Sequence, residues 1–267
     1  MLLEGLAEAA IAAGAAIMAI YDSDFAVETK ADSSPVTAAD GAAEAVILEA
    51  VARLAPGVPV VAEEEVSAGR IPNTEGDFFL VDPLDGTKEF ISRNGDFTVN
   101  IALVEDHAPT LGVVFAPVER RLYIGDVARG EAWSATVDEH GAIGSRQPLR
   151  IRPAPAEGLA AVASRSHNSP ATEAYLDGFQ IASRISRGSS LKLCMVACGE
   201  ADLYPRLAPT MEWDTAAGDA VLRAAGGMVR GPDGDPMRYG KPRFFNPGFV
   251  AAGDVETPPI APFLVGE

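Results

Sequence analysis

Two short apolar segments each run directly into acidic residues, and this pattern constrains the fold more than any other feature of the sequence. Val58 to Ala62 is followed by Glu63, Glu64 and Glu65, and Phe78 to Val81 is followed by Asp82. Val-rich and aromatic runs of this length are typical of buried strands. Because carboxylates beside a buried strand are awkward without a counter-charge, the pattern indicates a site that gathers cations, although a solvated loop is the alternative for the three glutamates.

The second of these segments continues into a tight turn. Residues 82 to 90 read Asp-Pro-Leu-Asp-Gly-Thr-Lys-Glu-Phe, and Pro83 and Gly86 favour a turn directly after the strand. Such a turn can direct the Asp82 carboxylate, the Leu84 carbonyl and the Asp85 carboxylate at one point. Hard oxygen ligands at this density suit Mg²⁺ or Mn²⁺ rather than zinc. An ordinary turn is the alternative for this segment taken alone.

Three further positions are consistent with such a site and also have ordinary explanations. Gly86 and Thr87 can open a short helix whose N–H groups face a phosphate. Asp214 directly precedes a predicted helix, where Asp is a common N-cap. Asp40 follows Thr37 with the spacing of a capping box, and it can also serve the site.

Charge limits the classes of partner. The 267-residue chain has a net charge of −17, so it should repel nucleic-acid polymers and anionic membranes. A phosphorylated substrate is repelled as well, unless bound metal neutralises the acids. The Ala-rich segment Leu6 to Ile20 contains Glu8 and follows Glu4, and it has no basic region before it. It is therefore predicted to be neither a signal peptide nor a membrane span, and a cytoplasmic location is the default.

The cysteines and histidines do not suggest a second metal site. Cys194 and Cys198 are four residues apart in an apolar segment, so one helical face holds both, which favours core packing. The histidines are scattered among polar or turn residues and are predicted to lie at the surface: His107, His140 and His167.

The order of predicted elements indicates two kinds of layer. The first half is expected to contain helices at 2–20 and 38–54 and, after the two acidic strands, strands at 97–104, 111–116 and 121–126. The polar segment 138–155 is the candidate boundary. The second half alternates strands at 159–163, 180–185 and 201–204 with helices at 170–179, 190–198 and 215–225, which indicates an α/β layer. The tail from Thr257 is expected to be loose.

Several stretches match one family in order and spacing. They are Ser34 to Asp40, Ala62 to Glu64, Asp82 to Phe90, Asn94 to Leu103, Ser164 to His167, Gly188 to Lys192, Leu203 to Arg206, Trp213 to Gly218 and Phe245 to Phe249. On these stretches the chain resembles the inositol monophosphatase superfamily of lithium-sensitive, magnesium-dependent phosphatases. Within it, Lys-Glu-Phe at 88–90 and Gly-Ser-Ser-Leu-Lys at 188–192 favour the CysQ-type 3′(2′),5′-bisphosphate nucleotidases. Ala62 departs from the usual Gly or Ser, but it is also small.

The resemblance implies a fold and a metal site. The fold is a layered α-β-α-β-α sandwich, α+β over residues 1–147, which carry most metal ligands, and α/β over 148–267, which carry Asp214 and the specificity residues. Glu63, Asp82 and the Leu84 carbonyl would hold one Mg²⁺, and Asp82, Asp85 and Asp214 a second. Mn²⁺ is expected to substitute for Mg²⁺, and Li⁺ to inhibit.

The resemblance also implies catalytic and substrate-binding roles. Thr87, with Glu63, would position the water that attacks phosphorus. Asp40 would hydrogen-bond Thr87 and contribute to a third, weakly held ion. The implied substrate-binding set is Glu63, Leu84, Asp85, Gly86, Thr87, Asp214, Ser189, Lys192, Arg165 and Arg206. The last four come from the second half, and solvated surface groups are the alternative for each of them.

The predicted function is magnesium-dependent hydrolysis of the 3′-phosphate of adenosine 3′,5′-bisphosphate to AMP and phosphate. Activity on inositol phosphates or fructose bisphosphate within the same superfamily is one alternative, and a non-catalytic metal- or phosphate-binding regulator is another. A phosphatase of the haloacid-dehalogenase type would need Asp-x-Asp, but two residues separate Asp82 from Asp85. The oligomeric state is left open.

Overall fold

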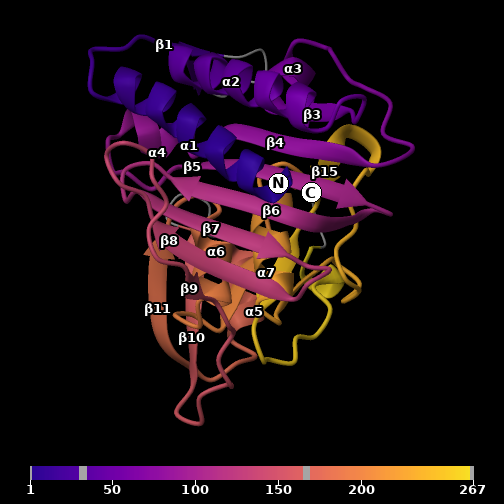
Figure 1. The fold of residues 1–267 in the computed structure, drawn as a ribbon. Coiled ribbons are helices and arrows are strands. Elements are labelled where there is room, and N and C mark those ends of the chain that lie inside the picture. The colour runs from indigo at the N-terminus through magenta and orange to yellow at the C-terminus, as the bar shows by residue number, and fades with distance from the viewer. Residues whose placement is uncertain (1, 30–34, 165–168, 265–267) are drawn as a thin grey trace.

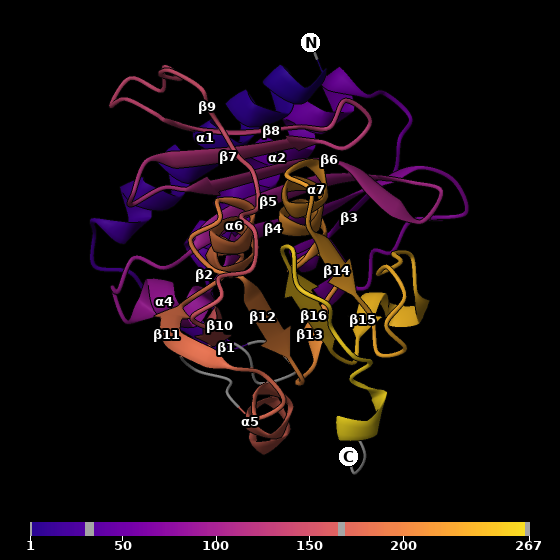
Figure 2. The same ribbon diagram turned by 90° about the horizontal axis from the view of Figure 1, so that it is seen from below.

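The computed structural model describes residues 2–29, 35–164 and 169–264, and these form five layers (Figure 1). Helices α1 (Leu2–Tyr21) and α2 (Ala38–Leu54) cover one face of a large sheet. Helices α6 (Leu191–Ala197) and α7 (Ala216–Ala224) lie between this sheet and a smaller one, and α5 (Pro170–Leu176) lies beyond the smaller sheet (Figure 2). The layered α-β-α-β-α architecture is confirmed.

The large sheet brings the two acidic segments together. Its strand order is β3-β4-β5-β6-β7-β8-β9, and β3 and β4 run parallel whereas the other neighbours are antiparallel. Ala62 at the end of β3 is in register with Val81, so Glu63 and Asp82 follow at the same edge. The strands are β3 (Val60–Ala62), β4 (Phe78–Asp85), β5 (Thr98–Glu105), β6 (Ala108–Ala116), β7 (Arg121–Asp126), β8 (Glu131–Thr136) and β9 (Gln147–Pro148).

The smaller sheet has the order β11-β10-β12-β16-β14 and mixes parallel and antiparallel pairs. Its strands are β10 (Leu159–Ser164), β11 (Ile181–Arg187), β12 (Leu203–Arg206), β14 (Met228–Arg230) and β16 (Phe249–Ala252). Two short ribbons pair β1 (Val27–Thr29) with β2 (Pro35–Thr37), and β13 (Thr210–Met211) with β15 (Phe245–Asn246). The remaining short helices are α3 (Glu63–Ser67), α4 (Thr87–Ile91), η1 (Pro242–Phe244) and η2 (Ala261–Phe263).

Helix α1 is long and apolar enough to cross a membrane by length and composition. In this structure one of its faces belongs to the core, since Leu6, Ala10 and Ile17 are fully buried. Gly14 contacts β6 so closely that an added Cβ would lie 2.5 Å from the ring of Phe115. These contacts are those of a core helix packed on a sheet.

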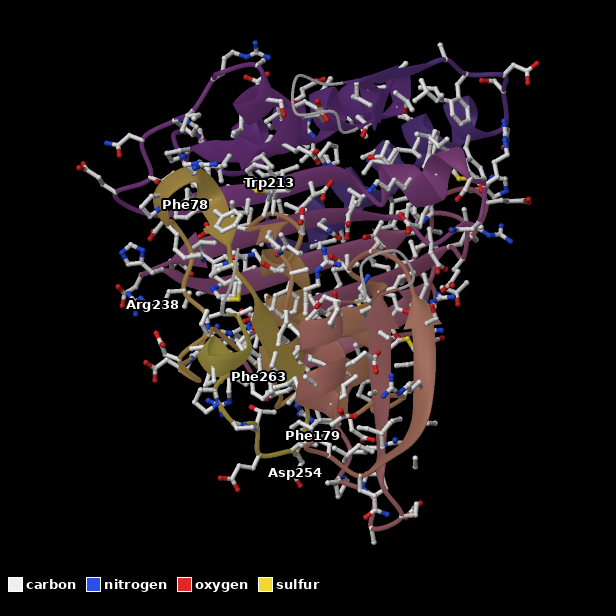
Figure 3. All side chains as sticks on the ribbon, turned by 180° about the vertical axis from the view of Figure 1, so that it is seen from behind. Phe78, Phe179, Trp213, Arg238, Asp254 and Phe263 are labelled. Atoms are coloured by element: carbon white, nitrogen blue, oxygen red, sulfur yellow. The ribbon has the colours of Figure 1, made fainter. Side chains whose placement is uncertain are left out.

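Helix α7 approaches the large sheet at two glycines. A Cβ added to Gly112 of β6 would lie 2.3 Å from the carbonyl oxygen of Ala217, and one added to Gly125 of β7 would lie 2.6 Å from the Cα of Val221. Phe78 of the large sheet and Trp213, just before α7, belong to the same buried cluster (Figure 3). The second half of the chain is thereby packed tightly on the first.

The structure confirms most predicted elements and corrects two expectations. Strand β4 does not end at Asp82 but continues to Asp85 after an irregularity in register, which accommodates Pro83. The described part of the tail is not loose, because Ile260 is buried and the Tyr175 hydroxyl donates to the carbonyl of Pro258 at 2.9 Å.

Smaller predictions have mixed outcomes. Cys194 is buried in the core, as expected, whereas β8 was not predicted. His167 lies outside the described residues. The division of the chain at residues 147 and 148 stays a proposal.

Candidate active site

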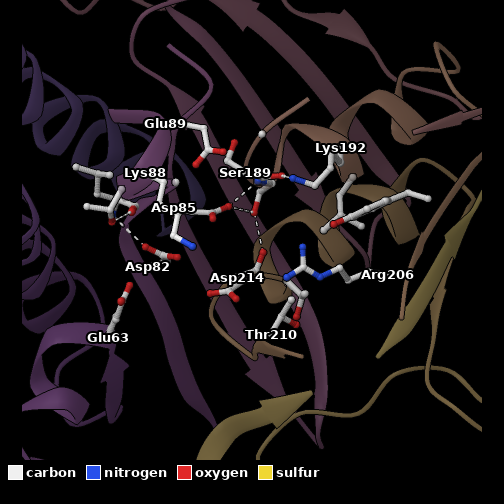
Figure 4. Close-up of a pocket in the computed structure, with 18 of the residues that line it drawn as sticks. Glu63, Asp82, Asp85, Lys88, Glu89, Ser189, Lys192, Arg206, Thr210 and Asp214 are labelled. Atoms are coloured by element: carbon white, nitrogen blue, oxygen red, sulfur yellow. Dashed lines mark hydrogen bonds between the residues drawn. The ribbon is translucent and has the colours of Figure 1, made fainter. Parts of the chain in front are cut away.

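A cavity of about 280 Å³ opens between the two sheets. Figure 4 shows Glu63, Asp82 and Asp85 entering it from the large-sheet side, and Lys192 and Arg206 from the other. The predicted site residues that line it are Glu63, Asp82, Leu84, Asp85, Gly86, Thr87, Ser189, Lys192, Arg206 and Asp214. Arg165, also predicted, lies outside the described residues. Segments more than 100 residues apart in sequence thus meet at one place.

The acids of the cavity lie near one another, and Asp82 is the most buried of them. Asp82 is 2% exposed, and its Oδ1 accepts the backbone N–H of Leu84 at 3.0 Å, which closes the turn. Burial raises the pKa of Asp82 well above its usual value, and the charges of Glu63, Asp85 and Asp214 raise it further. Burial and the charge of Asp85 likewise raise the pKa of Asp214 to about 8. A bound proton or a nearby positive charge would therefore relieve the repulsion within the cluster.

The turn after β4 depends on a glycine. Gly86 has φ of +98°, and a Cβ there would lie 3.0 Å from the carbonyl oxygen of Asp96, so a larger residue is strained for both reasons. Thr87 then begins the short helix α4, which turns its first residues toward the cavity.

Asp40 lies behind Thr87. Its Oδ2 accepts the backbone N–H of Thr37 at 2.8 Å, which forms the expected capping box of α2. Its Oδ1 accepts the Thr87 hydroxyl at 3.3 Å, and the same hydroxyl lies 3.4 Å from the carbonyl of Leu84. Asp40 is 1% exposed, so it contacts the cavity through Thr87 and does not line it.

Among the described residues of the second half, two basic side chains reach the cavity. The buried Lys192 ammonium donates to the carbonyl of Ser189 at 2.6 Å, and burial lowers its pKa to about 8 against the raising effect of Asp85. The Arg206 guanidinium donates to the carbonyls of Ala208 at 3.3 Å and Pro209 at 3.1 Å. Figure 4 shows its head directed toward Asp214.

Ser190 is a cavity residue that the sequence prediction missed. It lies beside the predicted Ser189, and its backbone N–H and hydroxyl both donate to Asp85, at 2.6 and 3.0 Å. Lys88 and Glu89 also line the cavity without having been predicted to do so. The only sequence signal for these residues was their place inside the two matching stretches.

The donor set fits hard divalent cations. The candidate ligands are carboxylate and carbonyl oxygens, which Mg²⁺ prefers. Two buried polar atoms on β5 beside them, Thr98 Oγ1 and Asn100 Oδ1, have no hydrogen-bond partner in the described part of the chain. Within the same residues, no group of three or more His, Cys, Asp and Glu side chains has the geometry of a completed metal site. The acids line the cavity without closing on one point.

Comparisons with known proteins find one matching family model and several similar proteins. Residues 2–258 match the model of the inositol monophosphatase family. The chain is 46% identical to the 3′(2′),5′-bisphosphate nucleotidase CysQ of Escherichia coli K12 over 252 residues, which cover 93% of this chain and 98% of that protein. It is 38% identical to the corresponding CysQ of Buchnera aphidicola over 94% of this chain and 93% of that protein.

Solved structures of members of the same family align with this chain over most of its length. The crystal structure of CysQ from Bacteroides thetaiotaomicron, described as a bacterial member of the inositol monophosphatase family, aligns with a TM-score of 0.78 and 38% identity, covering 95% of this chain and 97% of that one. An inositol monophosphatase from Anabaena sp. PCC 7120 aligns with a TM-score of 0.73 and 28% identity, over 94% and 90%.

Proposed function

Because the chain belongs to the inositol monophosphatase family, we propose that it is a 3′(2′),5′-bisphosphate nucleotidase that hydrolyses adenosine 3′,5′-bisphosphate to AMP and phosphate. The observation that carries this proposal is the 46% identity to the CysQ nucleotidase across 93% of the chain. The cavity supports it, since acids suited to metal ions lie on one side and basic groups on the other.

Two metal ions are part of the proposal. Glu63, Asp82 and the Leu84 carbonyl would hold one Mg²⁺, and Asp82, Asp85 and Asp214 would hold a second. Bound ions would supply charge neutralisation and acidify water, which is what phosphoryl transfer most requires. The raised pKa values of Asp82 and Asp214 support this proposal, because a positive charge in the cavity would stabilise both carboxylates. Mn²⁺ as a substitute, a third ion near Asp40 and inhibition by Li⁺ are further parts of this proposal.

The protein's own groups would orient the attacking water and the phosphate. The Thr87 hydroxyl has one proton, and the hydrogen bond to Asp40 directs that proton away from the cavity. The Thr87 oxygen can then accept a hydrogen bond from the attacking water. Glu63 would orient the same water from the β3 side. The amides of Gly86 and Thr87 would hold the phosphate. The water oxygen bonds to phosphorus, the bond from phosphorus to ribose O3′ breaks, and the ribose oxygen takes up a proton.

Discrimination among substrates would come from the second half. The ions account for one phosphate in any substrate, whereas a nucleoside bisphosphate adds a second phosphate and a base. Arg206, Lys192 and Ser189 line the cavity opposite the acids, and Arg is well suited to a phosphate. Arg165 is proposed for the same role from its place in the matching sequence stretch. We place the reaction in the cytoplasm, where soluble nucleotides are available.

A panel of phosphate esters tests the proposal. With Mg²⁺ present, kcat/KM for adenosine 3′,5′-bisphosphate should exceed that for inositol 1-phosphate and fructose 1,6-bisphosphate. Preference for inositol 1-phosphate would assign the chain to the inositol-phosphate branch while leaving the metal mechanism intact. No phosphate release from any ester would favour a binding protein without catalysis, in which Glu63, Thr87 and Asp40 would not have the proposed catalytic roles.

A further inference from the structure

Ser190 lies between two of the proposed metal ligands, Asp85 and Asp214, and contacts both. Its backbone N–H donates to Asp85 Oδ2 at 2.6 Å. Its hydroxyl oxygen lies 3.0 Å from the same Asp85 oxygen and 2.7 Å from the main-chain oxygen of Asp214. One buried serine therefore contacts both carboxylate residues that are assigned only to the second ion.

Asn100 of β5 restricts the acceptors of the serine proton to two. The side-chain nitrogen of Asn100 lies 2.8 Å from the Ser190 hydroxyl and 3.4 Å from Asp85 Oδ2. An ionised carboxylate only accepts hydrogen bonds, so the amide nitrogen and not its oxygen faces Asp85. Ser190 accepts from Asn100, and its single proton is left for Asp85 or the Asp214 carbonyl. Both side chains are at most 2% exposed, so bulk water does not replace these bonds.

The hydrogen bonds of Asp85 involve one of its oxygens. The Ser190 N–H and the Asn100 amide donate to Oδ2, and the Ser190 hydroxyl lies 3.0 Å from the same oxygen. In the described part of the chain no donor reaches Oδ1, so this oxygen is the one presented to a cation. We propose that Ser190, oriented by Asn100, is a positioning residue that holds Asp85 and Asp214 at a fixed separation and so sets the affinity for the second metal ion.

The backbone around Ser190 is held by other contacts. Gly188 N donates to Asp96 at 2.9 Å, and Lys192 donates to the carbonyl of Ser189, whose φ is +47°. A Cβ on Gly188 would lie 2.7 Å from the Asp96 carbonyl oxygen, so the turn sits directly on the large-sheet side. Replacing the Ser190 side chain therefore removes the hydroxyl and leaves the turn and its N–H in place.

Binding of Mn²⁺ to the metal-free protein, followed by the electron paramagnetic resonance of free Mn²⁺, tests this inference. The wild type should show two classes of site. Ser190→Ala should weaken the weaker class by about tenfold to a hundredfold, the usual effect of losing a group that orients a metal ligand. The tighter class, assigned to Glu63, Asp82 and the Leu84 carbonyl, should change less than about twofold. The Mg²⁺ concentration for half-maximal activity should rise in parallel, and Ser190→Thr should restore both values.

Ser134→Ala is the matched control. Ser134 is also fully buried and accepts a hydrogen bond from Arg121 at 2.6 Å, but it lies on β8 away from the cavity. The Ser134→Ala substitution should lower the melting temperature without changing Mn²⁺ binding. Asn100→Leu should weaken the second site, and the double variant Ser190→Ala/Asn100→Leu should be no weaker than Ser190→Ala alone, because Asn100 acts through the serine.

The outcomes separate this inference from the proposed function on which it rests. Unchanged second-site binding in Ser190→Ala, equal losses in Ser134→Ala, or a single class of site in the wild type would each overturn the inference. If the wild type binds two ions but hydrolyses no phosphate ester, the proposed function fails, and the Mn²⁺ titration still decides the role of Ser190.

Discussion

At the scale of single residues, the buried carboxylates favour function over stability. Asp82 and Asp214 line the cavity, and burial raises the pKa of both. A buried carboxylate without a cation destabilises the fold, and the same property makes it a strong ligand when a cation is present. Stability of the metal-free protein and activity of the metal-bound protein should therefore respond oppositely to the same substitution.

Asp82→Asn and Asp214→Asn test this opposition. Each should lower the Mg²⁺-dependent kcat by roughly a thousandfold or more, because charge stabilisation at the phosphate is lost. In EDTA each variant should melt at or above the wild-type temperature at pH 8, since an uncompensated buried charge has been removed. The exposed Asp177→Asn should change neither value. Full turnover of the wild type in EDTA would rule out the metal mechanism.

Arg206 is the residue that best separates the candidate substrates. If it binds the second phosphate, Arg206→Ala should lower kcat/KM for adenosine 3′,5′-bisphosphate by about tenfold to a hundredfold, the effect of one charge-assisted contact. A monophosphate substrate should be nearly unaffected. Arg238→Ala, an exposed arginine outside the cavity (Figure 3), is the control. An equal fall for both substrates would mean that Arg206 only supports its turn through Ala208 and Pro209.

At the scale of elements, α2 supports α3 through a buried acid. Glu44 of α2 is 4% exposed and accepts the backbone N–H of Glu64 at 2.8 Å. The residue before α3, Ala62, has no side chain that could cap the helix, so Glu44 supplies this bond from another element. Burial raises the pKa of Glu44 from 4.5 to about 7, the hydrogen bond from Glu64 opposes this, and the charges of Glu63, Glu64 and Glu65 add to it.

Glu44→Gln should change how stability depends on pH. Between about pH 4.5 and 7 the folded wild type keeps a proton that the unfolded chain has released, so its stability falls as pH rises through this window and stays lower above it. Gln keeps an acceptor for Glu64 and does not titrate. In EDTA the variant should match the wild type near pH 4.5 and exceed it by about 1–3 kcal/mol at pH 8, measured by urea unfolding. A difference that does not change with pH, or the same gain in the exposed Glu49→Gln, would refute this account.

At the scale of the whole molecule, the cavity exists because α7 lies closely against the large sheet. Asp214 precedes α7, whereas Glu63 follows β3 of that sheet and Asp82 and Asp85 lie in β4. The distance between helix and sheet therefore sets the distance between the acids. Gly112 and Gly125 permit the close approach.

Gly112→Ala should separate these layers. The added methyl would meet the main-chain oxygen of Ala217 at 2.3 Å, and a backbone atom cannot move aside cheaply. We expect a loss of about 1–3 kcal/mol in the free energy of unfolding, with weaker Mg²⁺ activation. Gly41→Ala is the control, since that glycine lies on the exposed side of α2 with nothing within 4 Å, and it should gain up to about 1 kcal/mol. Equal stability of the two variants would contradict the packing argument.

Local sequence determined most elements and the family. Helix α2 begins at the predicted capping box and spans the predicted residues 38–54, and β7 also spans its predicted residues. Patterns of this kind depend on neighbours in the chain, which is why they are visible without the fold. The continuation of β4 to Asp85 was not predicted, because Pro83 is a local signal for a turn and only pairing with β5 shows that the strand goes on.

In the candidate site, too, some features follow from local sequence and others only from tertiary packing. The acids and Thr87 were identified from motifs, and the sequence by itself determined the family and the chemistry of the donor atoms. Only the tertiary structure decided that Ser190 and Asn100 meet Asp85, and that Glu44 caps a helix outside its own segment. Ser190 and Asp85 are 105 residues apart. No local pattern encodes such a contact, because it arises from the packing of two sheets around α7.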